Sequence, residues 1–286
     1  MTEEAVKSIE GYIKNMPSLP TSVSKVLEVC NNQDTSPADL NHVISLDPVL
    51  VGRMLKLINS VYYGLGQQVT NLVRAIIMLG INTVKNLVLS TTVVQNLSPK
   101  NNSLGLDAEG FWRHSLCVGV AAKQLAKMRG IDPKLLEEYF TAGLLHDLGK
   151  IPLNAVRAQE CIKAVSAADR NRKPLFWEEE QTMGINHCTA GELIVKAWQL
   201  EGPIGDAVVY HHHYDEYSGA HKDLLYTIIA ANFFACTAEL GFSGDRYPRY
   251  VEQSVWKFLK VPSDVFAPLK NTVHTEIEKA AIFLRI

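Results

Sequence analysis

Apolar residues recur along this chain at the three- and four-residue spacing of α-helices. Convincing alternation of apolar and polar residues, which would predict half-buried strands, is absent. The longest β-branched run, residues 84–94, is too long for an ordinary strand, and we interpret it as a buried helix that Asn82 caps at its start. The pattern predicts an all-α fold.

Helix start and stop signals support this prediction. Ser36-Pro37 and Asp47-Pro48 each place a capping side chain before a proline that fits the first helical turn. Glycines can adopt the left-handed conformation that often ends a helix. They stand where helices are expected to end, at Gly80, Gly130 and Gly149.

A polar stretch rich in helix breakers, residues 98–105, separates two apolar helical blocks. We place a domain boundary there. Residues 1–105 would form an N-terminal bundle of five to six helices, and residues 106–286 a second helical domain packed against it. Another loop-prone region, residues 241–248, precedes two final helices.

Composition limits the class of protein. The chain has 286 residues, of which 47% are hydrophobic and 20% charged, as in an ordinary soluble protein. The net charge of −2 provides no basic field, which disfavours a nucleic-acid partner. The N-terminus lacks the apolar core of a secretion signal, and the apolar stretches carry too many polar residues to span a membrane. We therefore expect a cytoplasmic protein without a membrane partner.

The five cysteines are odd in number and far apart, and none forms a Cys-x-x-Cys pair. This spacing supports neither a zinc ribbon nor a disulfide framework. Cys117, Cys188 and Cys236 lie among apolar neighbours, and we expect them to be small core residues. The candidate chemistry lies in the histidines instead.

Five of the nine histidines, with one aspartate, form a pattern that is typical of metal sites. Imidazole and carboxylate are the usual ligands of first-row transition metals, and this mixture suits Fe, Mn, Zn or Ni. The pattern predicts a centre for one or two ions, provided that the fold brings the residues together. The candidate ligands are His114, His146, Asp147, His187, His211 and His212.

Each candidate also has a purely structural interpretation. His146 and Asp147 end an apolar helix, where neighbouring side chains can turn toward one point. Alternatively, Asp147 caps the next helix and His146 fills the core. His114 lies on an apolar helix, where a lone histidine is often a core residue. Residues 211–213 are three consecutive histidines that span about 200° of a helix, so they cannot all face one site.

Several short motifs follow one another along the chain. They are Asp47-Pro48, Asn59-Ser60-Val61-Tyr62-Tyr63-Gly64, Leu79-Gly80, Trp112-Arg113-His114 and His146-Asp147-Leu148-Gly149-Lys150. In this order they resemble the HDOD domain, a helical bacterial signalling module related to the HD and HD-GYP phosphohydrolases. The resemblance covers residues 16–256 and implies an HD-like fold for the second domain.

The resemblance implies roles for the candidates. His114 matches the first histidine of HD proteins, and His187 matches a later histidine of HD-GYP relatives that a glycine, here Gly191, follows four positions on. His211 and His212 would face the site, with residue 213 turned to solvent.

Lys150 and Asn232 affect whether such a site is catalytic. With Asp147, Lys150 would be a catalytic residue that contacts substrate phosphate; its alternative is an exposed cation at a helix end. Asn232 stands where HD enzymes carry a further aspartate ligand, so it is a weaker, neutral candidate for the metal. The Gly-Tyr-Pro motif of HD-GYP proteins is also missing.

The resemblance favours a regulatory HDOD output protein in bacterial signal transduction, with its metal site retained or degenerate. It would act through signalling proteins or a bound nucleotide. The alternative is a metal-dependent phosphohydrolase, a phosphodiesterase of nucleotides or cyclic dinucleotides, and a third class is a sensor that binds a nucleotide without cleaving it. Residues 59–64 would form a packed turn, with the hydroxyls of Tyr62 and Tyr63 near solvent, or a recognition surface.

Overall fold

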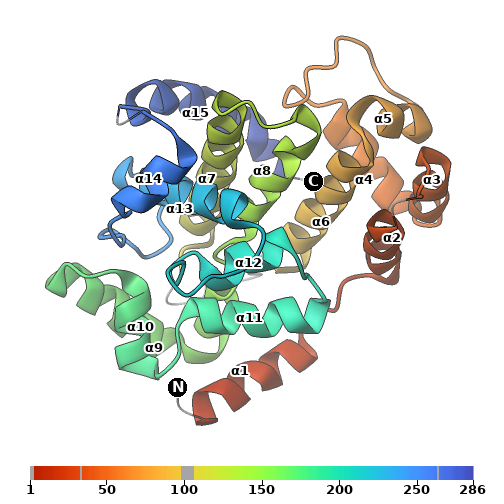
Figure 1. Cartoon of the computed structure of the whole chain (residues 1–286). Coiled ribbons are helices and arrows are strands. Elements are labelled where there is room, and N and C mark those ends of the chain that lie inside the picture. Colours follow the sequence, from red (N-terminus) through yellow and green to blue (C-terminus); the bar gives the residue numbers. More distant parts are fainter. Residues whose placement is uncertain (1–2, 33, 98–105, 263, 286) are drawn as a thin grey trace.

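The computed structural model describes residues 3–32, 34–97, 106–262 and 264–285, and the regular structure in these ranges is helical throughout, as predicted (Figure 1). No single helix in them is long and apolar enough to cross a membrane, and only the pair of helices Leu72–Leu79 and Ile81–Leu97, bent by 111°, passes that test together. The first half contains α1 (Glu3–Asn15), α2 (Thr21–Asn31), α3 (Pro37–Ser45), α4 (Pro48–Ile58), α5 (Leu72–Leu79) and α6 (Ile81–Leu97). The second contains α7 (Ala108–Met128), η1 (Pro133–Leu135), α8 (Leu136–Leu145), α9 (Lys150–Asn171), α10 (Leu175–Met183), α11 (His187–Trp198), α12 (Pro203–Tyr210), α13 (Lys222–Thr237), α14 (Gln253–Leu259), α15 (Phe266–Ala280) and η2 (Ala281–Leu284).

Side-chain caps fix several helix starts in the N-terminal half. The Ser36 hydroxyl accepts a hydrogen bond from the Asp39 backbone N–H, and the Asp39 carboxylate accepts one from the Ser36 backbone. This reciprocal capping box starts α3. The predicted cap at Asn82 is wrong, because α6 already begins at Ile81. The Asn82 side chain instead donates to the backbone carbonyl of Lys134 at 3.3 Å.

The two halves of the chain are joined by packing. α6, which holds residues 84–94 as a buried helix as predicted, packs on α2 and α8. α1 lies at the bottom of the view in Figure 1, apart from α3 to α5 at the right, and packs on α9 and α11. The expected boundary at residues 98–105 lies outside the described residues. One hydrophobic core includes side chains from Ala5 to Phe283, so both halves contribute to it.

The turn after α4 belongs to this junction. The Tyr62 ring packs on Phe140 of α8 with ring centroids 5.5 Å apart. Its hydroxyl accepts a hydrogen bond from Nζ of Lys123 at 2.9 Å, and Lys123 also pairs with Glu137. The Tyr63 hydroxyl is buried without a hydrogen-bond partner. The prediction that both hydroxyls lie near solvent is therefore wrong, and the tyrosines attach the N-terminal bundle to the second half.

Two glycines let α7 and α8 cross closely. A Cβ at Gly119 would lie 2.7 Å from the carbonyl oxygen of Phe140, and one at Gly143 would lie 2.7 Å from Cα of Gly119. Any larger residue at these positions would push the helices apart. His114 lies on α7 and His146 directly follows α8, so this crossing sets the separation of the two histidines.

Asp223 joins α13 to the ends of α7 and α8. Its carboxylate accepts hydrogen bonds of 3.1 and 2.5 Å from the Arg129 guanidinium and one of 2.5 Å from the Tyr139 hydroxyl. Burial alone would raise the pKa of this carboxyl, but Arg129 and Tyr139 lower it below its ordinary value. The charged form is therefore favoured in the folded protein.

Asp223→Asn is expected to lower the free energy of unfolding by about 1 kcal/mol at pH 7, a modest value because the pair is partly exposed. A carboxyl whose pKa is lowered by folding stabilises above its unfolded pKa of about 3.9 and loses this effect as the pH falls through the folded value. In urea unfolding, the difference between wild type and variant should therefore shrink below about pH 4. A difference that stays constant from neutral to acid pH would contradict this, and Asp34→Asn, at an exposed position, is the control.

Candidate metal centre

Helix ends supply most of the predicted ligands. α8 ends just before His146, α11 begins at His187, and α12 ends just before His211. At a helix end the backbone leaves its regular path, so consecutive side chains can face one point. α7 and α13, which pack together, supply two more residues from within helices. The structure gathers in one buried region the side chains of His114, His146, Asp147, His187, His211, His212 and Asn232.

Asp147 lies in the middle of this cluster, and its two oxygens face different histidines. Oδ2 is 3.5 Å from Nε2 of His146 and 3.8 Å from Nε2 of His114. Oδ1 is 3.4 Å from Nε2 of His187 and 3.5 Å from Nε2 of His211, and these two nitrogens are 3.3 Å apart. Ligand atoms of one tetrahedral ion lie about 3.4 Å from one another. Each oxygen of Asp147 therefore faces a separate pair of histidine nitrogens at distances close to those between metal ligands.

Hydrogen bonds hold the rings with Nε2 turned inward. His146 and His211 each donate from Nδ1 to a backbone carbonyl, at 2.7 and 2.9 Å, and His187 donates from Nδ1 to Glu179 at 2.5 Å. Metal-binding histidines commonly hold their second nitrogen in this way. Nε2 of His146 and Oδ1 of Asp147 are buried without a hydrogen-bond partner. Such atoms are rare in folded proteins, so the donor set fits a divalent transition metal.

The histidines differ in charge because their neighbours differ. Burial lowers the pKa of His114 to about 4 and that of His146 well below its ordinary value, so both rings are neutral at pH 7. Burial also disfavours the charged form of His187, but the Glu179 carboxylate raises its pKa to about 10. A ligand nitrogen must lose its proton to bind a metal. Ion binding at His187 would therefore release a proton.

Asn232 lies beside His114. Its Oδ1 is 3.1 Å from Nε2 of His114, which donates a hydrogen bond to the amide oxygen. The amide oxygen therefore contacts the ring nitrogen of His114 that would bind an ion held between His114, His146 and Asp147. Because an amide is neutral, it adds no charge to balance a cation, so ion binding here depends on the single carboxylate of Asp147.

Lys150 is buried, so its interpretation as an exposed helix-end cation is wrong. Nζ donates to Oδ2 of Asp147 at 2.7 Å and to the Ser243 hydroxyl at 3.1 Å. Burial alone would lower the pKa of this amine, but Asp147 raises it, so the amine stays charged. With Asn154, Glu179 and Ser243 it lines a cavity of about 50 Å³. Asp147 does not cap α9, because no side chain caps the start of that helix.

His212 lies at the edge of the cluster. Its ring stacks on Phe176 with centroids 4.5 Å apart and meets the His187 ring edge-on at 5.0 Å. His213, expected to face solvent, is partly exposed, and its Nε2 is 3.3 Å from the side-chain amide of Asn186. His212 therefore shapes one wall of the centre, whereas four other histidines direct a nitrogen at Asp147.

Two residues of the centre could not be identified from the sequence. Glu179 receives hydrogen bonds from both the backbone N–H and the ring of His187, but nothing in its own surroundings along the chain marks it. Cys188, expected to be a core residue, is buried with its Sγ 3.8 Å from Nδ1 of His211. Its position directly after a candidate ligand is the one signal that could have identified it.

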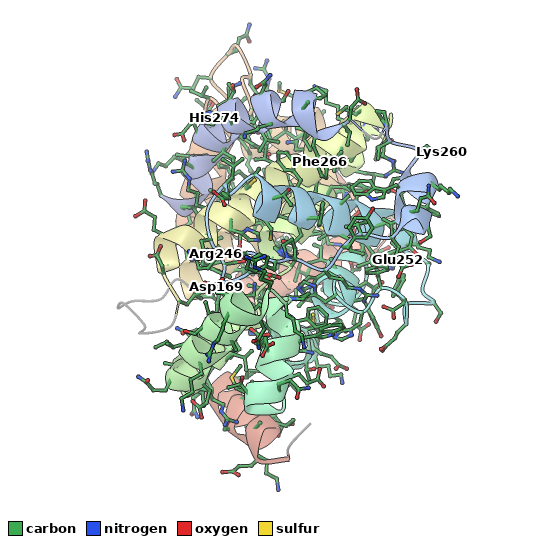
Figure 2. All side chains as sticks on the ribbon, turned by 90° about the vertical axis from the view of Figure 1, so that its left-hand side faces the viewer. Asp169, Arg246, Glu252, Lys260, Phe266 and His274 are labelled. Carbon is green, nitrogen blue, oxygen red and sulfur yellow. The ribbon has the colours of Figure 1, made fainter. Side chains whose placement is uncertain are left out.

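Residues 241–248 form the predicted loop and close the centre beside Lys150. Ser243 contacts Lys150, and the Phe242 N–H donates to the carbonyl of Gly110 on α7 at 2.9 Å. Arg246 pairs with Asp169 of α9 at 3.0 Å (Figure 2). These contacts hold the loop against α7 through Phe242 and against α9 through Arg246.

Solved structures with a similar fold come from several bacteria. An HDOD domain protein from Geobacter sulfurreducens has a TM-score of 0.76 and 23% identity, and the match covers 98% of this chain and 97% of that one. A proposed signal transduction protein from Marinobacter aquaeolei VT8 has a TM-score of 0.75 and 20% identity, over 95% of this chain and 60% of that one. A proposed metal-dependent phosphohydrolase from Shewanella amazonensis SB2B has a TM-score of 0.60 and 21% identity, over 96% and 100%. At these identities the matches show the fold.

A curated relative comes from Treponema pallidum (strain Nichols), where the protein is described as uncharacterized. It is 24% identical over 275 residues, which cover 96% of this chain and 51% of that protein. This chain therefore spans about half the length of its relative. The HDOD domain family matches residues 16–214, a range that includes α2 to α6 and the histidines of α7, α11 and the ends of α8 and α12. Since this range is most of the chain, the protein belongs to the HDOD domain family.

Proposed function

We propose that this protein is a regulatory module in bacterial signal transduction whose second half holds one or two divalent transition-metal ions. The observation that supports a regulatory role best is that the centre is closed. None of the five candidate histidines, nor Asp147, is more than 4% exposed. A nucleotide-sized substrate reaches a metal ion only through an open pocket, so ligands this deeply buried favour a regulatory role over turnover.

His114 and His146 would hold one ion with Oδ2 of Asp147, and His187 and His211 the other with Oδ1. The spacing of these atoms supports this assignment. A bound divalent cation would supply Lewis acidity toward water or phosphate. The protein itself holds the rings in one orientation and places the Lys150 cation beside Asp147, whose negative charge it partly offsets.

The alternative function is a metal-dependent phosphohydrolase, and the buried Lys150 next to a cavity is the feature that favours it. The cavity of about 50 Å³ can take water or a small anion. Pockets for drug-sized ligands are about 300–1,000 Å³. A nucleotide or cyclic dinucleotide would need the loop of residues 241–248 to open, and the same requirement holds for a sensor that binds a nucleotide without cleaving it.

A regulatory role requires a partner, and we infer that it is a signalling protein. Residues 59–68 offer a surface for it, since they line a hollow of about 530 Å³ and Val61 is 77% exposed. The partly buried tyrosines at positions 62 and 63 would support this surface rather than contact the partner. A bound nucleotide is the alternative.

Asn232→Asp tests the regulatory role against the enzymatic one. The carboxylate would add a charged ligand beside His114, so the affinity for Mn²⁺ or Zn²⁺ is expected to rise about 10-fold or more. Metal binding is measured by calorimetry on protein purified without an affinity tag for metals. Asn15→Asp, which adds the same charge at an exposed site on α1, should bind the metal as the wild type does.

Turnover decides between the functions. With Mn²⁺ or Fe²⁺ and a model phosphodiester or cyclic dinucleotide, the wild type is expected to show little or no hydrolysis, whereas Asn232→Asp would gain any latent activity. Wild-type turnover of about 1 s⁻¹ or more, a typical enzyme rate, would overturn the regulatory proposal.

A further inference from the structure

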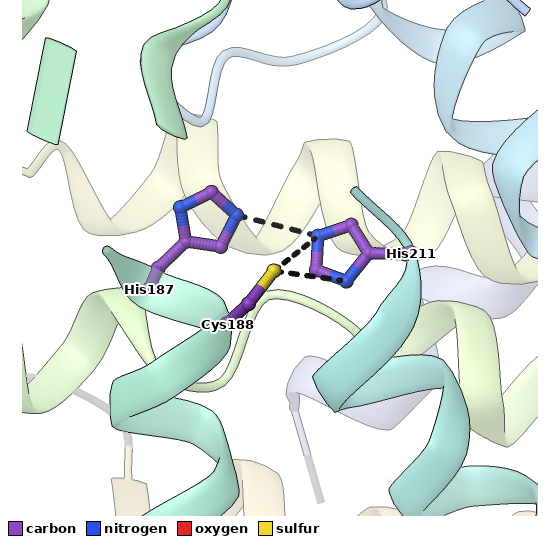
Figure 3. A group of neighbouring side chains, drawn as sticks. All are labelled: His187, Cys188 and His211. Carbon is purple, nitrogen blue, oxygen red and sulfur yellow. Dashed lines mark hydrogen bonds between the residues drawn. The ribbon is translucent and has the colours of Figure 1, made fainter. Parts of the chain in front are cut away.

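Cys188 is the second residue of α11 and lies inside the metal centre. Its side chain is a free thiol and is buried. Sγ is 3.8 Å from Nδ1 and 4.0 Å from Nε2 of His211 (Figure 3). Figure 3 also shows that Sγ lies near the gap between the rings of His187 and His211, whose Nε2 atoms are 3.3 Å apart. The thiol therefore approaches the position that one ion would occupy.

The distances suit a shared ion. Possible ligand atoms of His187, Cys188 and His211 all lie within 4.8 Å of one another. In a tetrahedral site, a nitrogen at 2.0–2.1 Å and a sulfur at 2.3 Å from the ion are separated by about 3.6 Å. A small rotation of the Cys188 side chain would bring its sulfur from 4.0 Å to this distance. Nδ1 of His211 is occupied by backbone carbonyls, so its Nε2 is the atom left for an ion.

Oδ1 of Asp147 points to the same ion position. It is buried without a hydrogen-bond partner and lies 3.4 and 3.5 Å from Nε2 of His187 and His211. Three donors thus surround one point, and Cys188, whose Sγ lies within 4.8 Å of ligand atoms of His187 and His211, is a candidate for a fourth. A tetrahedral ion with two neutral histidines and one carboxylate would carry a net charge of +1. A thiolate would neutralise it.

We propose that Cys188 is a thiolate ligand of the ion held by His187, His211 and Asp147, and that it makes this position selective for a thiophilic ion such as Zn²⁺ over Mn²⁺. Thiolate prefers such ions, whereas carboxylate and water suit Mn²⁺. The ion position between His114, His146 and Asp147 has nitrogen and oxygen donors, so the two positions would differ in preference. The inference rests on the metal centre of the proposed function and adds a ligand to it.

Cobalt provides a direct test. Co²⁺ bound through sulfur gives an intense thiolate-to-metal charge-transfer absorption in the near ultraviolet, whereas Co²⁺ bound only through nitrogen and oxygen gives its weak visible bands alone. Full-length protein titrated with Co²⁺ is expected to show both. Cys30→Ser, which changes a cysteine on α2, should keep the charge-transfer band, and Cys188→Ser should lose it while keeping visible bands.

Metal preference is the second measurement. In competition between Zn²⁺ and Mn²⁺, Cys188→Ser should lower the preference for Zn²⁺ by about 10-fold or more, since a soft ligand is lost. Asp147 and the histidines are unchanged in this variant, so Mn²⁺ binding should change little. Cys188→Ala is the replacement variant if the serine disturbs folding.

The outcomes separate the two proposals. Visible cobalt bands without charge transfer in the wild type would refute the thiolate ligand and leave the metal centre intact, and this result needs no variant. A charge-transfer band that persists in Cys188→Ser or Cys188→Ala would also refute it. Protein that binds no Co²⁺, Zn²⁺ or Mn²⁺ would refute both the ligand and the metal centre.

Discussion

Replacing Asp147 by asparagine is expected to weaken metal binding by at least about 100-fold, because even residues that only support a ligand cost 10- to 100-fold when they are lost. Asp147 is the carboxylate whose two oxygens face both pairs of histidine nitrogens. The amide is neutral and offers one oxygen, so it cannot bridge two cations. Elemental analysis after dialysis against buffer with a fixed free Zn²⁺ concentration measures the loss.

Asp132→Asn is the matched control for this substitution. Asp132 caps η1 by accepting a hydrogen bond from the Lys134 N–H, and asparagine caps helices equally well. This variant should keep the metal content of the wild type. Full metal content in Asp147→Asn would show that the histidines alone hold the ions, and the bridging position of Asp147 would then be wrong.

Gly149→Ala is expected to be the most destabilising single methyl addition near the centre. A Cβ at this position would lie 1.8 Å from the carbonyl oxygen of His187 and 2.5 Å from the backbone nitrogen of Gly191. Both are backbone atoms of α11, so relief requires that the start of α9 and the start of α11 move apart. We expect a loss of about 4 kcal/mol or more in the free energy of unfolding, together with loss of metal binding.

Gly52→Ala is the control, since a Cβ there would meet no atom within 4 Å on α4. Alanine favours a helix by about 1 kcal/mol over glycine, so this variant should be as stable as the wild type or more stable. Denaturant unfolding followed by circular dichroism compares them. Equal stability of Gly149→Ala and the wild type would mean that α9 and α11 are not in this close contact.

Much of this structure depends on local signals, and those parts could be predicted. The capping box at Ser36 and the helix end before His146 are determined within a few residues of the chain. The wrong cap at Asn82 shows the limit of such signals, because Gly80 ends α5 and the next helix starts at once. A polar side chain near a helix start can equally bond across to another segment, as Asn82 does to Lys134.

Contacts between distant segments could not be predicted. Lys150 could be a phosphate contact or a surface cation from the sequence, and its burial depends on contacts with distant segments such as the loop that holds Ser243. Glu179 supports His187 from another helix, and no local pattern indicates that pairing. Tyr62 and Tyr63 each have an apolar ring and a polar hydroxyl, so the sequence is compatible with a solvent-exposed turn as well as with a buried one. Burial of such residues is decided by which helices pack on them.

The loop of residues 241–248 has a consequence for the rate of metal exchange. Its contacts with Lys150, α7 and α9 cover the centre on the side of the Lys150 cavity, so an ion that passed through this cavity would need the loop to be displaced. Exchange would then be limited by how often this segment opens, and extraction by a chelator would not speed up as more chelator is added. A protein with this property would release its ion at the rate of loop opening, whatever the metal concentration outside. Its metal content would therefore follow a change in metal supply with a delay that the opening of the loop sets.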